Sequence, residues 1–181
     1  LLPETYHYQW GDDRAALVGR MRDSMRRVLE ELWPERVDDL PFETPEEAVV
    51  LASIVEKETA VAAERPLVAG VFINRLRRGM RLQSDPTVAY ALTGGDAELE
   101  RALTRADWAV DSPYNTYRHA GLPPGPIANP GRESIAAVLQ PAETDYLYFV
   151  ADGSGGHAFA KTLAEHNRNV ARWRRLRDGG S

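Results

Sequence analysis

Cysteine is absent from the 181 residues, and lysine is nearly so: Lys57 and Lys161 are lysines, whereas the other basic residues are arginines. Without cysteine the chain has no disulfide bond, no thiolate metal site and no cysteine nucleophile. The compartment stays open, because cysteine-free proteins occur in oxidising and reducing environments alike. We interpret the excess of arginine over lysine as an effect of genome composition.

Long apolar runs are also absent, since no stretch approaches the roughly 18 apolar residues of a transmembrane helix. The chain opens on Leu1-Leu2-Pro3, without an initiator methionine or a signal peptide. We therefore expect a processed or cloned piece of a longer protein, so that any targeting segment would lie upstream of Leu1. A formal net charge of -5 argues against a general nucleic-acid binder.

The length and composition indicate one globular domain over residues 1–181, because about 100–200 residues per domain is usual. Hydrophobic residues make up 43% and charged residues 27%, as in an ordinary globular protein. Apolar spacing and turn signals predict a mostly helical α+β fold with one small antiparallel hairpin. The expected helices cover about 13–33, 45–63, 66–78, 87–92, 133–139 and 163–177, and the expected strands cover 146–150 and 157–160.

The most informative segment is the second expected helix, which contains two acidic residues close together. At about 100° per residue, Leu51, Ile54 and Val55 share one arc of this helix, and Glu58 lies within it. Glu56 points elsewhere. A carboxyl group on an apolar face is desolvated, which raises its pKa and suits a general acid. Glu58 is thus the candidate acid and Glu56 the fallback; the alternative is that burial ends at Val55 and Glu58 is a surface residue.

Two loops carry the remaining polar candidates. Gln83, Ser84 and Asp85 precede a short helix, where Ser84 or Asp85 could equally serve as its N-cap. Residues 111–131 form a loop rich in Pro and Gly, a length and composition typical of functional loops. In it, Tyr114, Asn115 and Tyr117 offer rings and an amide suited to sugars and acetamido groups. Ordinary loop packing is the alternative.

Other polar groups carry weaker signals. Arginines 75, 77, 78 and 81 crowd one helix end, where cations complement the helix dipole, and binding of an acidic substrate is the less favoured reading. His157, His166 and Asp152 do not have the spacing of a metal site. We therefore expect no metal and no organic cofactor.

Several segments together resemble the YceG-like endolytic murein transglycosylases. The resemblance runs from about residue 1 to 173 and rests on Ala52-Ser53-Ile54-Val55-Glu56-Lys57-Glu58-Thr59, Val71-Phe72-Ile73-Asn74-Arg75-Leu76, Leu82-Gln83-Ser84-Asp85-Pro86-Thr87-Val88, Tyr114-Asn115-Thr116-Tyr117, Gly121-Leu122-Pro123-Pro124-Gly125-Pro126-Ile127, Tyr146-Leu147-Tyr148-Phe149-Val150-Ala151 and His166-Asn167. It implies cleavage of the β-1,4 bond between N-acetylmuramic acid and N-acetylglucosamine in peptidoglycan, with a 1,6-anhydromuramoyl product end that limits glycan strand length.

The resemblance has further implications. Lysozyme-like transglycosylases have a Glu-Ser pair on a helix, and Glu58-Thr59 resembles that pair, which implies a lysozyme-like site of helix and loops. Gln83, Ser84, Asp85 and the loop residues would then contact sugar. Family members are similar in carrying an N-terminal membrane helix and a LysM-like module, both outside this chain, and in acting beside peptidoglycan synthases. That implies a place in the bacterial cell envelope, on the periplasmic face of the inner membrane.

Two other functions fit the same residues. A hydrolytic muramidase would use Asp85 as a second carboxylate that activates water. A non-catalytic glycan-binding scaffold beside a synthase would need no acid at all.

Overall fold

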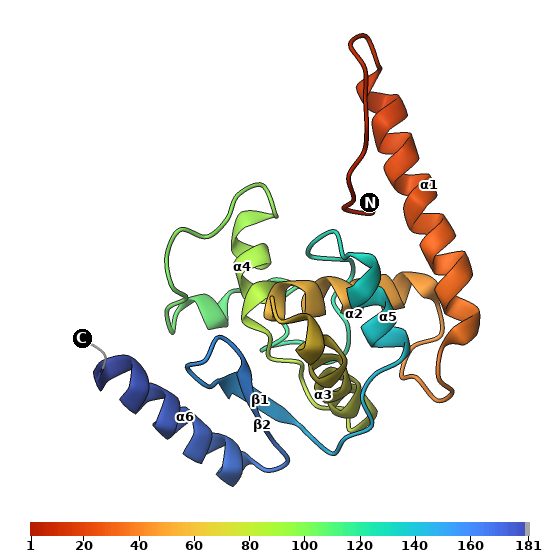
Figure 1. Ribbon diagram of the computed structural model, residues 1–181. Helices are drawn as coiled ribbons and strands as arrows, with labels where there is room; N and C mark the ends of the chain where they lie inside the picture. The colour runs from red at the N-terminus through yellow and green to blue at the C-terminus, as the bar shows by residue number, and fades with distance from the viewer. Residues whose placement is uncertain (180–181) are drawn as a thin grey trace.

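The computed structural model describes residues 1–179, which fold into helices around a small central core, with one hairpin at the side (Figure 1). The helices are α1 (Arg14–Leu32), α2 (Pro45–Glu58), α3 (Arg65–Arg77), α4 (Asp85–Thr93), α5 (Arg132–Leu139) and α6 (Leu163–Gly179), and the strands are β1 (Tyr148–Ala151) and β2 (His157–Ala160). The expectation of a mostly helical α+β fold is confirmed.

The core forms where α2, α3 and α5 pack against one another in the middle of the molecule (Figure 1). Leu51 and Ile54 of α2, Phe72 of α3, and Ile135 and Val138 of α5 have at most 1% of their surface exposed. Burying a side chain of this size stabilises the fold by about 1.5–3 kcal/mol. Helix α3 is buried on several sides because neighbours surround it, so its apolar residues do not form a single stripe.

Helix α2 begins as its sequence predicts. Thr44 and Glu47 form a capping box, in which the Glu47 amide donates to Thr44 Oγ1 at 3.2 Å and the Thr44 amide donates to Glu47 Oε2 at 3.1 Å. Pro45 occupies the first helical position, where its missing N–H costs nothing.

The end of α2 differs from the expectation of a helix to about residue 63. The helix stops at Glu58, and Thr59 is extended, with φ -140° and ψ 131°. The hydroxyl of Thr59 accepts the amide of Val61 at 3.1 Å, a local side-chain bond that replaces the next helical one. The candidate acid is therefore the last residue of its helix rather than an interior one.

The hairpin forms the second layer of the molecule. Strands β1 and β2 are antiparallel, with Phe149 opposite Phe159. Phe149 meets Phe72 of α3 edge to face, with ring centroids 5.8 Å apart, which joins the hairpin to the core. Helix α6 follows directly and packs along the hairpin (Figure 1).

Helix α1 projects from the rest of the molecule, and the N-terminal segment runs beside it (Figure 1). Asp13 caps it by accepting the amide of Ala15, and the amide of Leu2 donates to the carbonyl of Met21 at 3.2 Å. Between residues 1 and 179 no helix combines the length and the apolar character that a membrane crossing requires.

Candidate active site

Glu58 lies in a cleft of about 370 Å³ that is walled by the start of α4, the hairpin and α6. Because α2 ends at this residue, its carboxyl group extends from the helix terminus toward the loop before α4. Ser84 donates its hydroxyl hydrogen to Glu58 Oε1 at 2.5 Å. The sequence thus brings together two predicted residues that are 26 positions apart.

The surroundings of Glu58 favour its protonated form. Burial raises the pKa of Glu58 from 4.5 to about 7, and the negative charge of Asp85 acts in the same direction. The hydrogen bond from Ser84 and the charges of His157 and Arg75 oppose this rise in pKa without cancelling it. A carboxyl group with a pKa near 7 is protonated in a large fraction of molecules at neutral pH, as a general acid must be.

The loop before α4 is fixed by unusual backbone and hydroxyl contacts. Gln83 has a φ of 52°, a left-handed conformation uncommon outside glycine, and it lines the cleft. Ser84 stands at the N-cap position of α4 but makes no side-chain cap, because its hydroxyl bonds to Glu58. Thr116 accepts the Ser84 amide at 3.0 Å, and Thr87 donates to the Ser84 carbonyl at 2.7 Å. Ser84 therefore occupies the N-cap position that the alternative assigned to it, but its hydroxyl does not cap the helix.

Asp85 and Tyr117 form the rim of the cleft. The Tyr117 hydroxyl donates to Asp85 Oδ1 at 2.6 Å, and the Trp108 indole donates to the same oxygen at 3.1 Å. The rings of Trp108 and Tyr117 stack with centroids 5.8 Å apart. Burial and the hydrogen bond to Asp85 raise the pKa of Tyr117, so this hydroxyl stays a donor. Trp108 was not anticipated from the sequence.

Asn115 and Tyr114 do not lie at the rim of the cleft. Asn115 is fully buried, and its amide donates to the carbonyls of Trp108 and Val110 while its oxygen accepts the amide of Tyr117. Tyr114 packs against Tyr90, with ring centroids 4.7 Å apart, and does not line the cleft. These two residues shape the loop that presents Tyr117, instead of facing the cleft as expected.

Glu56 has a structural environment. Its Oε2 accepts the amide of Gly131 at 3.0 Å and the hydroxyl of Ser134 at 2.6 Å. Both donors belong to the N-terminal turn of α5, where unpaired amides and the helix dipole favour a carboxylate. Glu56 therefore joins α2 to α5 and lies away from the cleft.

The cleft also contains Arg75 and His166, for which the sequence favoured a structural role over ligand or metal binding. Arg75 is 8% exposed and donates to the carbonyls of Leu147 at 2.6 Å and Leu82 at 2.7 Å, so it ties α3 to two walls of the cleft. Burial lowers the pKa of Arg75. His166 stacks on Tyr148 with centroids 5.2 Å apart. Burial lowers the pKa of His166, and its Nδ1 has no hydrogen-bond partner within the described chain.

A second layer of polar contacts holds the hairpin behind Glu58. Thr59 donates to Glu64 Oε2 at 3.3 Å, and the same oxygen lies 2.6 Å from His157 Nδ1. The His157 amide donates to Glu64 Oε1 at 2.8 Å. Glu64 therefore links the end of α2 to the start of β2, which positions the hairpin wall of the cleft.

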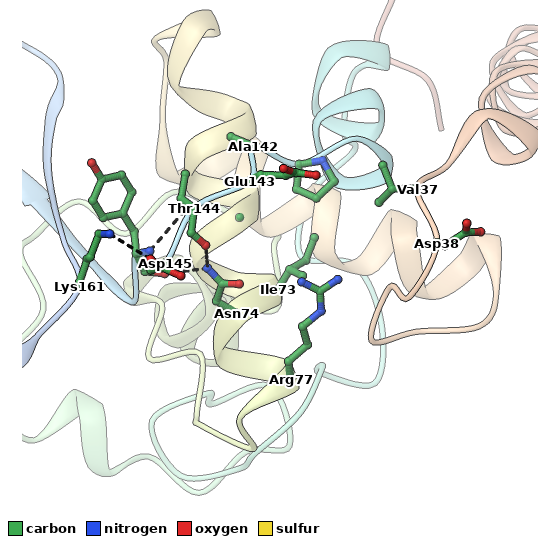
Figure 2. A pocket seen from close by; sticks show the side chains of 13 residues that line it. Val37, Asp38, Ile73, Asn74, Arg77, Ala142, Glu143, Thr144, Asp145 and Lys161 are labelled. Carbon is green, nitrogen blue, oxygen red and sulfur yellow. Dashed lines mark hydrogen bonds and ion pairs between the residues drawn. The ribbon is translucent and has the colours of Figure 1, made fainter.

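A larger hollow of about 680 Å³ lies on the opposite side of α3 (Figure 2). Taken together, its α3 residues Gly70, Ile73, Asn74 and Arg77 lie on the face of the helix opposite to that of Phe72 and Arg75. Asn74 donates to the carbonyls of Thr144 and Tyr146, and Lys161 pairs with Asp145 at 2.9 Å (Figure 2). These polar groups are engaged with one another, so the hollow is a poorer candidate than the smaller cleft.

No cluster of three or more potential metal ligands occurs among residues 1–179. The polar groups that line the cleft are two carboxyl groups, two hydroxyls, an amide, a guanidinium and an imidazole, a set suited to proton transfer and to hydrogen bonding with a polar substrate.

Comparison with known proteins gives consistent results. The YceG-like family model matches residues 1–172. The endolytic murein transglycosylase of Bacillus subtilis (strain 168) is 49% identical over 120 residues, which cover 66% of this chain and 32% of that protein. The Streptococcus pneumoniae R6 protein of the same name is 37% identical over 173 residues, which cover 94% of this chain and 31% of that protein.

A crystal structure of a yceG-like protein from Listeria monocytogenes superposes with a TM-score of 0.75. It is 41% identical, and the match covers 93% of this chain and 53% of that one. The chain thus spans about a third of the length of its curated relatives.

Proposed function

The chain belongs to the YceG-like family, and from this premise we propose that it is the catalytic part of a lytic transglycosylase that cleaves peptidoglycan glycan strands. The observation that carries the proposal is Glu58: a carboxyl group with a pKa of about 7 at the end of a helix, hydrogen-bonded to Ser84 in a cleft with aromatic walls. We further propose that residues 1–181 act as one catalytic domain.

In the proposed reaction Glu58 acts twice. Protonated Glu58 donates its proton to the glycosidic oxygen while the N-acetyl group of muramic acid assists at C1. The C1–O bond breaks, and the leaving sugar departs with a new hydroxyl. The Glu58 carboxylate then takes the proton of the C6 hydroxyl, whose oxygen displaces the acetamido oxygen from C1 and closes the 1,6-anhydro ring. The proton that Glu58 donates is thus replaced by the C6 hydroxyl proton, the bond between C1 and the C6 oxygen replaces the glycosidic bond, and no water is consumed.

The neighbours of Glu58 suit both steps. Burial and Asp85 favour the protonated acid before the bond breaks. The Ser84 hydroxyl and the charge of Arg75 stabilise the carboxylate that forms, so neither state of Glu58 is held too strongly. Gln83, Asp85 and Tyr117 lie at the cleft, where we propose that they orient the sugars.

A hydrolytic muramidase is the second candidate, because Asp85 lines the same cleft as Glu58. It would use Asp85 to activate a water molecule. Against this role, Asp85 Oδ1 already accepts hydrogen bonds from Tyr117 and Trp108.

The product mass separates the two reactions. Purified sacculi are digested with the protein and the released fragments are weighed by mass spectrometry. Anhydromuramoyl ends, lighter than the hydrolysed ends by one water, are expected. Reducing muramic ends would contradict the transglycosylase proposal, and the Asp85→Asn variant would then be expected to lose activity.

The cellular setting follows from the same proposal. We propose that the protein acts on peptidoglycan in the bacterial cell envelope, where the longer protein is anchored upstream of this chain on the periplasmic side of the inner membrane. Cleavage within nascent strands would limit their length beside peptidoglycan synthases. Expression of the full-length protein in a strain that lacks its own enzyme, followed by measurement of glycan strand length, tests this setting.

A further inference from the structure

A second cavity, of about 730 Å³, adjoins the cleft that contains Glu58. The two hollows share Asp85 at their boundary. Lys57 lines the second cavity and Glu58 lines the cleft, so consecutive residues at the end of α2 serve the two sides. A ligand held in the second cavity would therefore lie next to a ligand held in the cleft.

The two hollows differ in the surfaces that they offer. Tyr117, Tyr148 and Phe149 line the cleft, and such rings suit the faces of sugars. In the second cavity the aromatic lining residue of the described chain is Tyr90, whose ring packs on Tyr114 and would lie 2.8 Å from a Cβ at Gly95. Tyr114 and the backbone of Gly95 therefore leave little room for a sugar to stack on this ring. The remaining apolar lining is aliphatic, from Pro86, Ala89, Leu99, Leu103, Ile127 and Ala128.

Two cations, Lys57 and Arg101, line the second cavity together with three carboxylates, Asp85, Asp96 and Glu98. Lys57 Nζ lies 3.8 Å from Glu98 Oε1, in a pair whose side chains are 49% and 93% exposed. Such an exposed pair is weak and easily exchanged for another partner. Arg101, the other cation of the cavity, is held by Asp107 through two hydrogen bonds of 2.6 and 2.9 Å. Lys57 is therefore the cation best able to bind an incoming carboxylate.

We propose that the second cavity binds the stem peptide carried by the muramic acid residue at the cleavage point, with Lys57 pairing a carboxylate of that peptide. The inference rests on the proposed function. The stem peptide branches from the same sugar whose C1 reacts, so a site for it must adjoin the general acid. Its alanine methyl groups suit the aliphatic lining, and its carboxylates suit Lys57.

The test compares two substrates that differ in the peptide alone: uncross-linked glycan strands, and the same strands stripped of peptide by an amidase. For the unaltered protein, kcat/KM is expected to be higher for the peptide-bearing strands. Lys57→Gln should lower the ratio of the two kcat/KM values by about three- to fivefold, the size of a partly exposed ion pair. Ala89→Phe, which places a ring in the cavity, should lower the ratio further, mainly through KM.

Lys161→Gln is the matched control, because Lys161 pairs with Asp145 at the hollow on the far side of α3. It should leave the ratio unchanged. Equal losses on both substrates in Lys57→Gln, or an unmoved ratio in both cavity variants, would overturn the stem-peptide site while the transglycosylase proposal stands. An unaltered protein that cleaves neither substrate would overturn both. Melting temperatures of the variants show whether Ala89→Phe has kept its fold.

Discussion

Glu56 and Glu58 are two carboxyl groups on the same turn of α2, yet their surroundings are opposite. Glu56 accepts two hydrogen bonds from the N-terminal turn of α5, which join it to a second helix. Glu58 accepts one hydroxyl from Ser84 and lies half-buried in the cleft, and burial raises its pKa to about 7. The comparison teaches that a separation of two residues along one helix divides an acid that joins two helices from the acid that we propose as the proton donor.

The sharpest way to break this comparison is to remove the acidic proton from each residue in turn. Glu58→Gln should reduce release of anhydromuropeptides by about 10²–10⁴-fold, because glutamine keeps the shape but cannot act as a general acid. The matched Glu56→Gln variant should retain cleavage, since an amide oxygen still accepts from Ser134. Loss of activity in Glu56→Gln with full activity in Glu58→Gln would reverse the assignment.

The Ser84→Ala variant tests how the hydrogen bond from Ser84 affects the pKa and the activity of Glu58. The Ser84 hydroxyl stabilises the carboxylate, so its removal should raise the pKa of Glu58 further and shift the alkaline fall in activity to higher pH. A hydrogen bond to a charged group is worth about 1.5–3 kcal/mol, so kcat should fall on the order of tenfold. The pH profile of kcat measures both effects. An unshifted alkaline limb would show that Ser84 does not act through Glu58.

Glu56→Ala tests the structural half of the comparison. The change leaves the amide of Gly131 and the hydroxyl of Ser134 without their partner at the start of α5. We expect a loss of about 1–2 kcal/mol in the free energy of unfolding, the usual cost of a lost helix cap. Urea denaturation measures it, with Glu56→Gln as the milder control. A Glu56→Ala protein that remains folded but no longer cleaves glycan strands would indicate a catalytic role for Glu56.

Stability should also depend on pH through Glu58, with a definite sign. The native pKa of about 7 lies above the unfolded value of 4.5, so the folded state binds the proton more tightly and stability is lost as pH rises from about 4.5 through 7. Glu58→Gln removes this loss and should raise Tm by about 3–5 °C at pH 8 but hardly at pH 4. An equal gain at both pH values would show that ionisation of Glu58 is not its cause.

Much of the fold could be read from local sequence signals. The cap at Thr44, the left-handed Gly94 after α4 and the glycines of the hairpin turn mark element ends that lie within two residues of the predicted ones. The face of α2 that carries Glu58 was also predictable, since periodicity depends on neighbours in sequence. The end of α2 at Glu58 was not predictable, because it depends on the hydrogen bond that the Thr59 hydroxyl accepts from the amide of Val61.

The assembly of the site was only partly predictable, because its contacts join distant segments. Arg75 lies on an apolar helix near other arginines, and nothing local tells that it bonds to Leu147, 72 residues away. The amide of Asn115 is consumed by carbonyls of its own loop, which composition cannot reveal. A contact between aromatic residues, such as Trp108 with Tyr117, likewise exists only in the folded chain.

The burial of Glu58 has a consequence for when the residue gains its raised pKa during synthesis and folding. The walls of its cleft are supplied by segments as far along the chain as His166, more than a hundred residues beyond the acid. In a nascent or unfolded chain Glu58 keeps its ordinary pKa of 4.5 and is ionised at neutral pH, with no proton to donate. The raised pKa of Glu58 is thus acquired only after His166 has been synthesised, and we expect a chain that stops before this residue to lack the proposed cleavage activity.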